Sequence, residues 1–147
     1  MPKDTSQKNN LLLDIIRYID VYKNTEINLD ISVLSKILYL IDWKTCIEHG
    51  TQLTQLEWTN GNFGITCDHN LSLAYDLATR IKKSILDLNT SDTNIINFIL
   101  EKTYRMKYTD FAHLVQCTYP MIFSEKYEVL DLVKYANEYK IYKKENL

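Results

Sequence analysis

Glycine and proline are scarce in this chain, with 3 and 2 copies among 147 residues, which leaves little room for long loops or linkers. A basic excess is also missing: 17 lysines and arginines face 19 acidic residues, for a net charge of -2. Proteins that wrap DNA or RNA need such an excess, so we expect no direct nucleic-acid binding. No apolar run approaches the length of a membrane span, and no apolar signal segment follows the polar start of the chain.

Cysteine is rare as well, with three copies and no CxxC pair, which favours reduced thiols in a cytoplasm. Each cysteine has a histidine nearby in the sequence. The pairs are Cys46 with His49, Cys67 with His69, and Cys117 with His113. The first and third pairs have helical spacing and could face one ion. Structural zinc motifs rarely use such mixed pairs, and cysteine is a common small core residue, so we expect no metal site.

Sequence motifs for catalysis are missing too. Gly61-x-x-Gly64 matches neither a phosphate-binding Walker loop nor GxGxxG, and no nucleophile elbow occurs. The acidic pair Glu125 and Glu128 suits the first turn of a helix, where negative charge is favourable. The sequence therefore predicts no enzyme, no catalytic residue and no cofactor.

Helical periodicity dominates what is present. A hydrophobic content of 46% and a charged content of 24% are typical of a soluble globular protein of one domain. The expected helices cover residues 10–23, 31–49, 69–88, 92–107, 110–118 and 125–144. The expected caps are Asp30, Ser91, Thr109 and Ser124 at N-termini and Gly50 at a C-terminus, and Pro120 is expected to end the fifth helix. We predict a mainly α fold: a compact bundle of about six helices with one embedded β-hairpin around residues 54–67, in a single domain over 1–147 whose residues 1–9 are disordered.

The helix expected at 31–49 has large side chains on two faces. Its broad apolar arc, which we assign to the core, consists of Val33, Leu34, Ile37, Leu38, Leu40, Ile41 and Ile47. Tyr39 and Trp43 are neighbours on the opposite face. Two such large aromatic side chains must be covered either by a second layer of this protein, which we favour, or by a partner protein.

The stretch "LEWTNGNFGI" at 56–65 carries the strongest local signal. Asn60-Gly61 is the dipeptide preferred at type I′ hairpin turns. A turn there pairs Trp58 with Phe63 and Leu56 with Ile65, and places all four side chains on one face. Such a hairpin must pack on helices to be stable.

Several stretches, taken in order, resemble the Panacea domain, also described as the SocA-like antitoxin or phage-associated GepA-like family. The helix "LSKILYLIDWKTCIEHG" looks like that family's lysine-plus-"LLYLAD" helix, which ends in glycine. In "LTQLEWTNGNFGI", Thr54, Trp58, Phe63 and Gly64 fit the family's "ITG", aromatic and "YGP" landmarks, whereas Ile65 stands where proline is usual. "FAHLVQCTYPM" resembles "L-x-x-x-V-x-x-T-Y-P", and "YEVLDLVKYANEYK" resembles the closing "E-V-L-D-L-x-x-x-A-x-x-Y". The resemblance covers roughly residues 12–140 and marks a divergent member.

The resemblance implies a cytoplasmic protein of bacterial or phage origin that binds another protein. The expected function is an antitoxin that neutralises a cognate toxin, encoded next to it, by direct binding; a homodimer is left open. The alternative is a non-catalytic sensor, adaptor or scaffold of a phage-defence or phage-encoded assembly. Aromatic and apolar residues off the core stripes are the candidate partner contacts. They are Tyr39, Trp43, Trp58, Asn60, Phe63, Tyr127, Leu130 and Ile141.

Overall fold

The computed structural model describes residues 5–23, 28–80 and 88–145 of the chain. In chain order these form α1 (Thr5–Tyr22), α2 (Ile31–His49), β1 (Trp58–Gly61), β2 (Gly64–Cys67), α3 (Leu71–Arg80), α4 (Thr90–Thr103), α5 (Tyr108–Gln116), α6 (Tyr119–Phe123) and α7 (Leu132–Glu145). The mainly α fold with one small hairpin is thus confirmed, with seven helices in the described residues instead of about six. No helix among the described residues is long and apolar enough to span a membrane.

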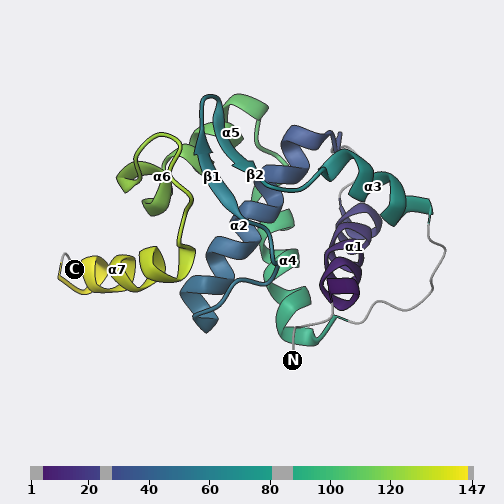
Figure 1. Cartoon of the computed structure of the whole chain (residues 1–147), viewed down its shortest axis with the longest axis horizontal. Coiled ribbons are helices and arrows are strands. Elements are labelled where there is room, and N and C mark those ends of the chain that lie inside the picture. Colours follow the sequence, from purple (N-terminus) through teal and green to yellow (C-terminus); the bar gives the residue numbers. More distant parts are fainter. Residues whose placement is uncertain (1–4, 24–27, 81–87, 146–147) are drawn as a thin grey trace.

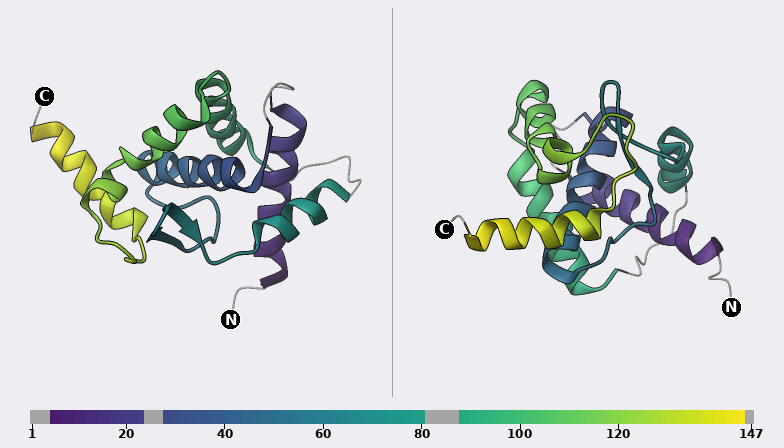
Figure 2. Two further views of the ribbon diagram at one scale, coloured as in Figure 1. Left: turned by 90° about the horizontal axis from the view of Figure 1, so that it is seen from above. Right: turned by 60° about the vertical axis from the view of Figure 1, so that its left-hand side comes forward.

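Helix α2 runs through the middle of the molecule and contacts most of the other elements (Figures 1 and 2). Helices α1 and α3 lie side by side at one end, and α6 and α7 pack together at the other. The hairpin crosses α2, with its tip at the top of Figure 1. A single buried cluster of hydrophobic side chains joins these elements.

The helix α2 has the predicted ends. The Asp30 carboxylate accepts a hydrogen bond from the Val33 backbone N–H at 2.9 Å, which caps the first turn. At the other end Gly50 adopts φ 77° and donates its N–H to the Cys46 carbonyl. Both caps are therefore confirmed.

Gly50 offers a clean test of the backbone at this cap. A Cβ added there meets no atom within 4 Å, so only the left-handed φ opposes a side chain. We expect Gly50→Ala to lower the free energy of unfolding by about 1–2 kcal/mol, measured by urea denaturation. Thr51→Ala, at the exposed neighbouring position, is the control and should change little. An unchanged urea midpoint for Gly50→Ala would contradict the assigned cap.

Both faces of α2 are buried. Tyr39 and Trp43, opposite the predicted core arc, are 0% and 8% exposed. The Tyr39 ring meets the edge of Trp58 from the hairpin, and the Trp43 ring meets Tyr139 of α7. The second layer that we favoured over a partner is therefore confirmed, and it consists of the hairpin and α7.

Several helix ends differ from the predictions. Helix α1 begins at Thr5, so residues 5–9 are helical, and the rest of the expected disordered segment lies outside the described residues. Asn89, not Ser91, caps α4, because its side chain accepts the Asp92 N–H at 2.8 Å. The third expected helix, 69–88, begins at Leu71 and is helical to Arg80; residues 81–87 are also outside the described residues, and Leu88 is not helical.

The region of α5 and α6 also differs from the predicted helix ends. Thr109 lies inside α5, whose N-cap Lys107 makes no side-chain cap bond. Pro120 does not end that helix: α5 stops at Gln116, and Pro120 stands in the first turn of α6. Proline is well tolerated there, because the first helical N–H groups have no partner within the helix.

The hairpin forms with another register than the one predicted. Trp58 pairs with Cys67 and Asn60 with Ile65, so the turn lies at Asn62-Phe63 and not at Asn60-Gly61. A type I′ turn at Asn60-Gly61 would need positive φ at both of these residues, and neither has it. The glycine with positive φ in the hairpin is Gly64, at 109°, directly after the observed turn. The predicted pairings of Trp58 with Phe63 and of Leu56 with Ile65 are therefore wrong. Leu56, Trp58 and Ile65 are buried as expected, but Phe63 is 98% exposed.

The last helix begins seven residues later than predicted, at Leu132 in place of 125. Residues 127–130 instead run along the free edge of β1. Val129 bridges Thr59, and the Leu130 N–H donates to the Trp58 carbonyl at 2.8 Å. The cap of α7 is Asp131, whose side chain accepts the Lys134 N–H, and not Ser124. Tyr127, Leu130 and Ile141 therefore do not form a stripe on one helix.

Candidate functional site

A buried carboxylate on α2 anchors the segment that carries the hairpin. Asp42 is 0% exposed, and its Oδ1 accepts the backbone N–H groups of Leu53 at 3.1 Å and Thr54 at 2.8 Å. The other oxygen, Oδ2, accepts three side-chain donors. These are Gln52 Nε2 at 3.1 Å, Trp58 Nε1 at 2.8 Å and the Thr54 hydroxyl. Asp42 thus holds the connection from α2 to β1 through a set of directed bonds.

The electrostatics of Asp42 fit a structural role. Burial raises the pKa of its carboxyl group, and the hydrogen bonds from Thr54, Trp58 and Gln52 act in the opposite direction. With several donors already on the carboxylate, little of its acceptor capacity is left for a substrate proton. We therefore assign Asp42 to positioning the hairpin.

The far end of the hairpin is fixed by residues 124–130. The Asn60 N–H donates to the Glu128 carbonyl at 3.0 Å, and the Tyr127 N–H donates to the Asn60 carbonyl at 2.6 Å. The Asn60 side-chain amide donates to the Ser124 hydroxyl at 2.9 Å, and the Tyr127 hydroxyl donates to the Asn62 side-chain carbonyl. Hydrogen bonds to both backbone and side-chain groups therefore hold the hairpin tip in place.

Tyr127 adopts a conformation that is unusual for its residue type. Its φ of 69° is the only positive value of a non-glycine residue in the described part of the chain. An aromatic side chain in the left-handed region costs about 1–3 kcal/mol, which surrounding contacts must offset. The bonds of Tyr127 to Asn60 and Asn62 are such contacts. The backbone strain thus lies at the contact that steadies the tip.

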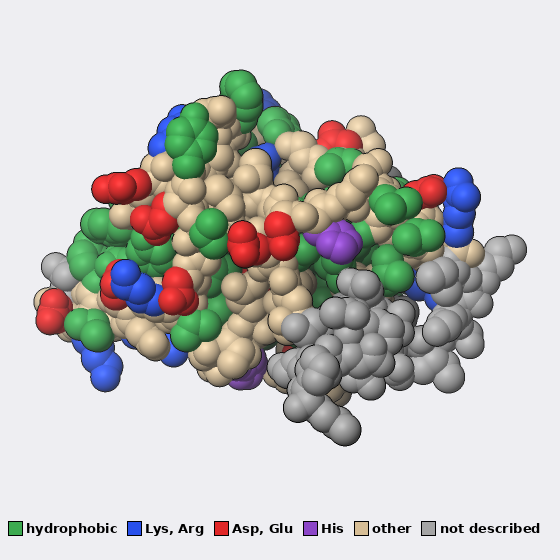
Figure 3. Space-filling view, in the orientation of Figure 1, with side chains coloured by type: hydrophobic (Ala, Val, Ile, Leu, Met, Phe, Trp, Pro, Cys, Tyr) green, Lys and Arg blue, Asp and Glu red, His purple; other side chains and the backbone are tan. Residues whose placement is uncertain are grey.

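Three of the predicted partner-contacting residues meet at this tip. Phe63 stands on the turn at 98% exposure, Tyr127 is 65% exposed beside it, and Asn60 is half-buried beneath them. We call Asn62, Phe63 and Tyr127 the hairpin-tip surface. In Figure 3 hydrophobic side chains stand at the top of the molecule, where the hairpin tip and α5 lie.

The other predicted contacts do not belong to this surface. Tyr39, Trp43, Trp58 and Leu130 are at most 8% exposed and pack inside the protein, which removes them from any surface on which a partner could rest. Ile141 is 58% exposed, but it belongs to α7, whose C-terminal end lies well away from the hairpin tip (Figures 1 and 2).

The cysteine–histidine pairs stay separate. Cys46 is buried, and burial raises the pKa of its thiol to about 12, so it stays protonated at neutral pH. Cys67 Sγ lies 3.6 Å from the backbone carbonyl oxygen of His69, and Cys117 Sγ, at the C-cap of α5, lies 3.4 Å from His113 Nε2. The described residues hold no group of three or more His, Cys, Asp or Glu side chains that could bind a metal ion.

Sequence reasoning missed the role of two polar residues on α2. Asp42 and Lys36 lie outside the predicted core arc of that helix, yet both are buried, at 0% and 9% exposure. The available signal was their position: Asp42 interrupts, and Lys36 begins, the apolar stretch "KILYLIDW" of α2. A charged residue in such a helix is buried only with dedicated partners.

Comparisons with known proteins identify no relative of this chain. No protein-family model matches the chain, and neither a curated protein nor a solved structure is significantly similar to it. The resemblance of its sequence stretches to the Panacea domain stays a prediction. The function of the hairpin-tip surface is therefore argued from its residues.

Proposed function

We propose that this chain is a non-catalytic protein-binding module whose hairpin-tip surface inserts Phe63 into an apolar pocket of a partner protein. One observation carries the proposal: a phenylalanine that is almost fully exposed stands on a turn held by hydrogen bonds from a neighbouring segment. An exposed aromatic side chain contributes little to folding. In an interface, by contrast, such a side chain is a typical anchor.

The bracing of the tip favours binding for an energetic reason. Association costs free energy wherever a loop or side chain must be ordered on contact. The bonds of Tyr127 and Asn60 order the turn beforehand, so less of that cost falls on the complex. The hydroxyl and amide groups of Tyr127 and Asn62 give the anchor a polar rim.

The partner that we propose is a toxin encoded next to this chain, with the complex formed in a bacterial cytoplasm. The support is the resemblance of the sequence stretches to the Panacea domain, together with the landmark position of Phe63 in it. In this proposal the chain neutralises the toxin by covering it, without chemistry of its own.

The test combines toxicity rescue with binding. The neighbouring gene is expressed alone and together with this chain, and the affinity of the purified complex is measured by calorimetry. We expect the neighbouring product to arrest growth, and this chain to restore it. Phe63→Ala should weaken the complex about 30-fold, as loss of an anchor worth about 2 kcal/mol does.

Phe98→Ala is the matched control, because Phe98 is an exposed phenylalanine on α4 at 42% exposure. It should leave affinity and rescue unchanged, and both variants should unfold like the parent chain. Equal affinity of Phe63→Ala and the parent would exclude the hairpin tip as the contact. A harmless neighbouring product would exclude the toxin, and co-purification with a larger effector would then identify a scaffold or adaptor.

A further inference from the structure

The first two turns of α2 and the first residue of α5 bring a lysine, a serine and a tyrosine into contact. Lys36 Nζ lies 3.0 Å from Ser32 Oγ and 3.3 Å from the Tyr108 hydroxyl. The two hydroxyl oxygens are themselves 2.5 Å apart. The three polar atoms thus form a closed triangle, and the ammonium also lies 5.2 Å from the centre of the Tyr108 ring.

Among the described residues, no carboxylate forms an ion pair with the ammonium of Lys36. The residue is 9% exposed. Asp30 acts on Tyr108 electrostatically, but its carboxylate accepts the Val33 N–H and caps α2. Lysine is rarely so buried unless an opposite charge neutralises it. The triangle therefore carries a positive charge that no ion pair among the described residues neutralises.

The triangle also has more donors than it uses. An ammonium group has three N–H donors, of which Ser32 and Tyr108 take two. The bond between the two hydroxyls uses the proton of one of them and leaves the other free. One N–H and one O–H are left to donate beyond the triangle, and each needs an acceptor.

The surroundings favour a negative charge at the same place. Ser32 lies in the first turn of α2, and Tyr108 is the first residue of α5, so both helix dipoles present their positive ends. The hydrogen bonds from Ser32 and Lys36 lower the pKa of the Tyr108 phenol, against the opposite effects of burial and of the Asp30 charge, so the triangle favours negative charge on an oxygen. Tyr108 is 50% exposed, which leaves the triangle open to solvent.

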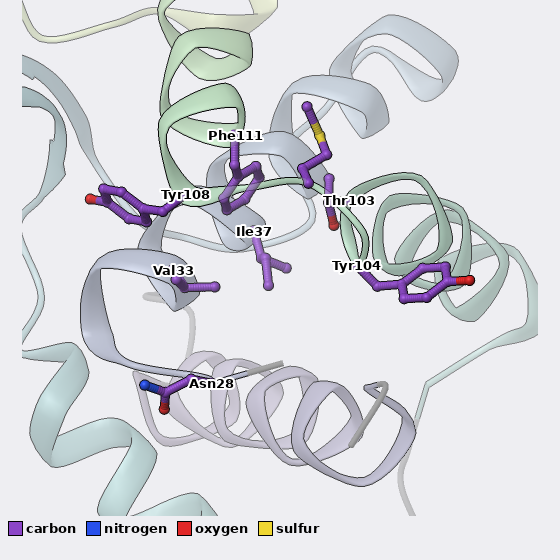
Figure 4. A pocket seen from close by; sticks show the side chains of 8 residues that line it. Asn28, Val33, Ile37, Thr103, Tyr104, Tyr108 and Phe111 are labelled. Carbon is purple, nitrogen blue, oxygen red and sulfur yellow. The ribbon is translucent and has the colours of Figure 1, made fainter. Parts of the chain in front are cut away.

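We propose that Lys36, Ser32 and Tyr108 form a binding site for one oxyanion, a carboxylate or phosphate group. One oxygen of the anion accepts the free Lys36 N–H, and a second accepts the free hydroxyl proton. Figure 4 shows the Tyr108 hydroxyl directed away from the cavity that Val33, Ile37 and Phe111 help to line. The site thus lies on the outer side of the Tyr108 ring, and the anion does not occupy that cavity.

The test is a titration of the full ¹⁵N-labelled chain with sodium phosphate, sodium acetate or N-acetyl-aspartate N-methylamide, with chloride keeping the ionic strength constant. We expect saturable shifts of the backbone amide signals of Ser32, Lys36 and Tyr108. Saturation by phosphate alone identifies a phosphate site, and saturation by acetate and the blocked aspartate identifies a carboxylate site, the latter as found on a protein partner. Shifts that do not saturate with any of the three anions would overturn the proposal.

Two variants separate binding from a merely structural contact. Lys36→Met removes the charge at similar length and should weaken binding at least tenfold; Tyr108→Phe removes one donor and should weaken it several-fold. Lys140→Met, at an exposed position on α7, is the control and should bind like the parent chain. Phosphate should raise the melting temperature of the parent chain more than that of Lys36→Met. Equal binding by the parent chain and Lys36→Met, or equal binding by the parent chain and Tyr108→Phe, would contradict the site.

Discussion

Asp42→Ala is expected to lower the free energy of unfolding by at least about 3 kcal/mol, because each buried donor left without an acceptor costs about 1–3 kcal/mol. The variant strips the acceptor from two backbone N–H groups and from the side chains of Gln52, Thr54 and Trp58. A water molecule in the vacated space offsets a part of this loss. Urea denaturation followed by helical circular dichroism measures the effect.

Asp42→Asn tests whether acceptor capacity or shape matters. An asparagine keeps the shape, and its oxygen can still face the N–H groups of Leu53 and Thr54. Its NH₂ group then meets the donors of Trp58 and Gln52, so donor opposes donor. We expect this variant to be closer in stability to Asp42→Ala than to the parent chain.

Asp30→Asn is the matched control on the same helix. Asp30 is an exposed N-cap, and asparagine caps a helix about as well as aspartate, so we expect a change below about 0.5 kcal/mol. If Asp42→Asn were as mild as Asp30→Asn, the carboxylate would not be what holds the hairpin to α2.

The local signals of the sequence predicted α2 well. Asp30 and Gly50 act through groups within one turn of the helix, so a short stretch suffices to recognise them. The apolar periodicity also predicted buried residues such as Leu34 and Ile37 correctly. Where the stabilising partners are close in sequence, the pattern therefore predicts the structure.

The hairpin register could not be predicted in this way. Asn60-Gly61 favours a turn locally, but the backbone of Asn60 bonds to Glu128 and Tyr127, more than sixty positions away. Those bonds require an extended Asn60 on the edge of β1, and the turn moves to the next two residues. The same pairing keeps residues 127–130 out of the last helix despite their helical spacing. Long-range β-pairing thus decided both elements against local propensity.

Of the hairpin-tip surface, Phe63 and Tyr127 were among the predicted contacts, whereas Asn62 and the geometry of the tip were not predicted. Phe63, Tyr127 and Asn60 were chosen as spare aromatics and turn residues, and the structure brings them together through the pairing that the sequence did not reveal. Tyr39 and Trp58 were chosen on the same grounds, yet they face each other in the core at 5.6 Å between ring centres. An aromatic residue outside the core stripe of a helix can be buried by a second layer of the same protein or by a partner protein, and the sequence pattern is the same in both cases.

Trp58→Ala is expected to lower the free energy of unfolding by about 3–5 kcal/mol, as loss of a buried tryptophan commonly does. Trp58 is 0% exposed, its indole N–H donates to Asp42 at 2.8 Å, and its ring and that of Tyr39 form a T-shaped contact. The substitution opens a cavity beneath the hairpin and leaves one oxygen of Asp42 short of a donor. Urea denaturation followed by circular dichroism measures the effect.

Trp58→Phe separates the two contributions, because it keeps most of the ring and removes only the N–H. A hydrogen bond to a charged group is worth about 1.5–3 kcal/mol, so this variant should fall between the parent chain and Trp58→Ala. In a double-mutant cycle with Asp42→Asn, the two losses should be non-additive, since both break the bond between Asp42 and Trp58. Strict additivity would mean that this bond does not couple α2 to the hairpin.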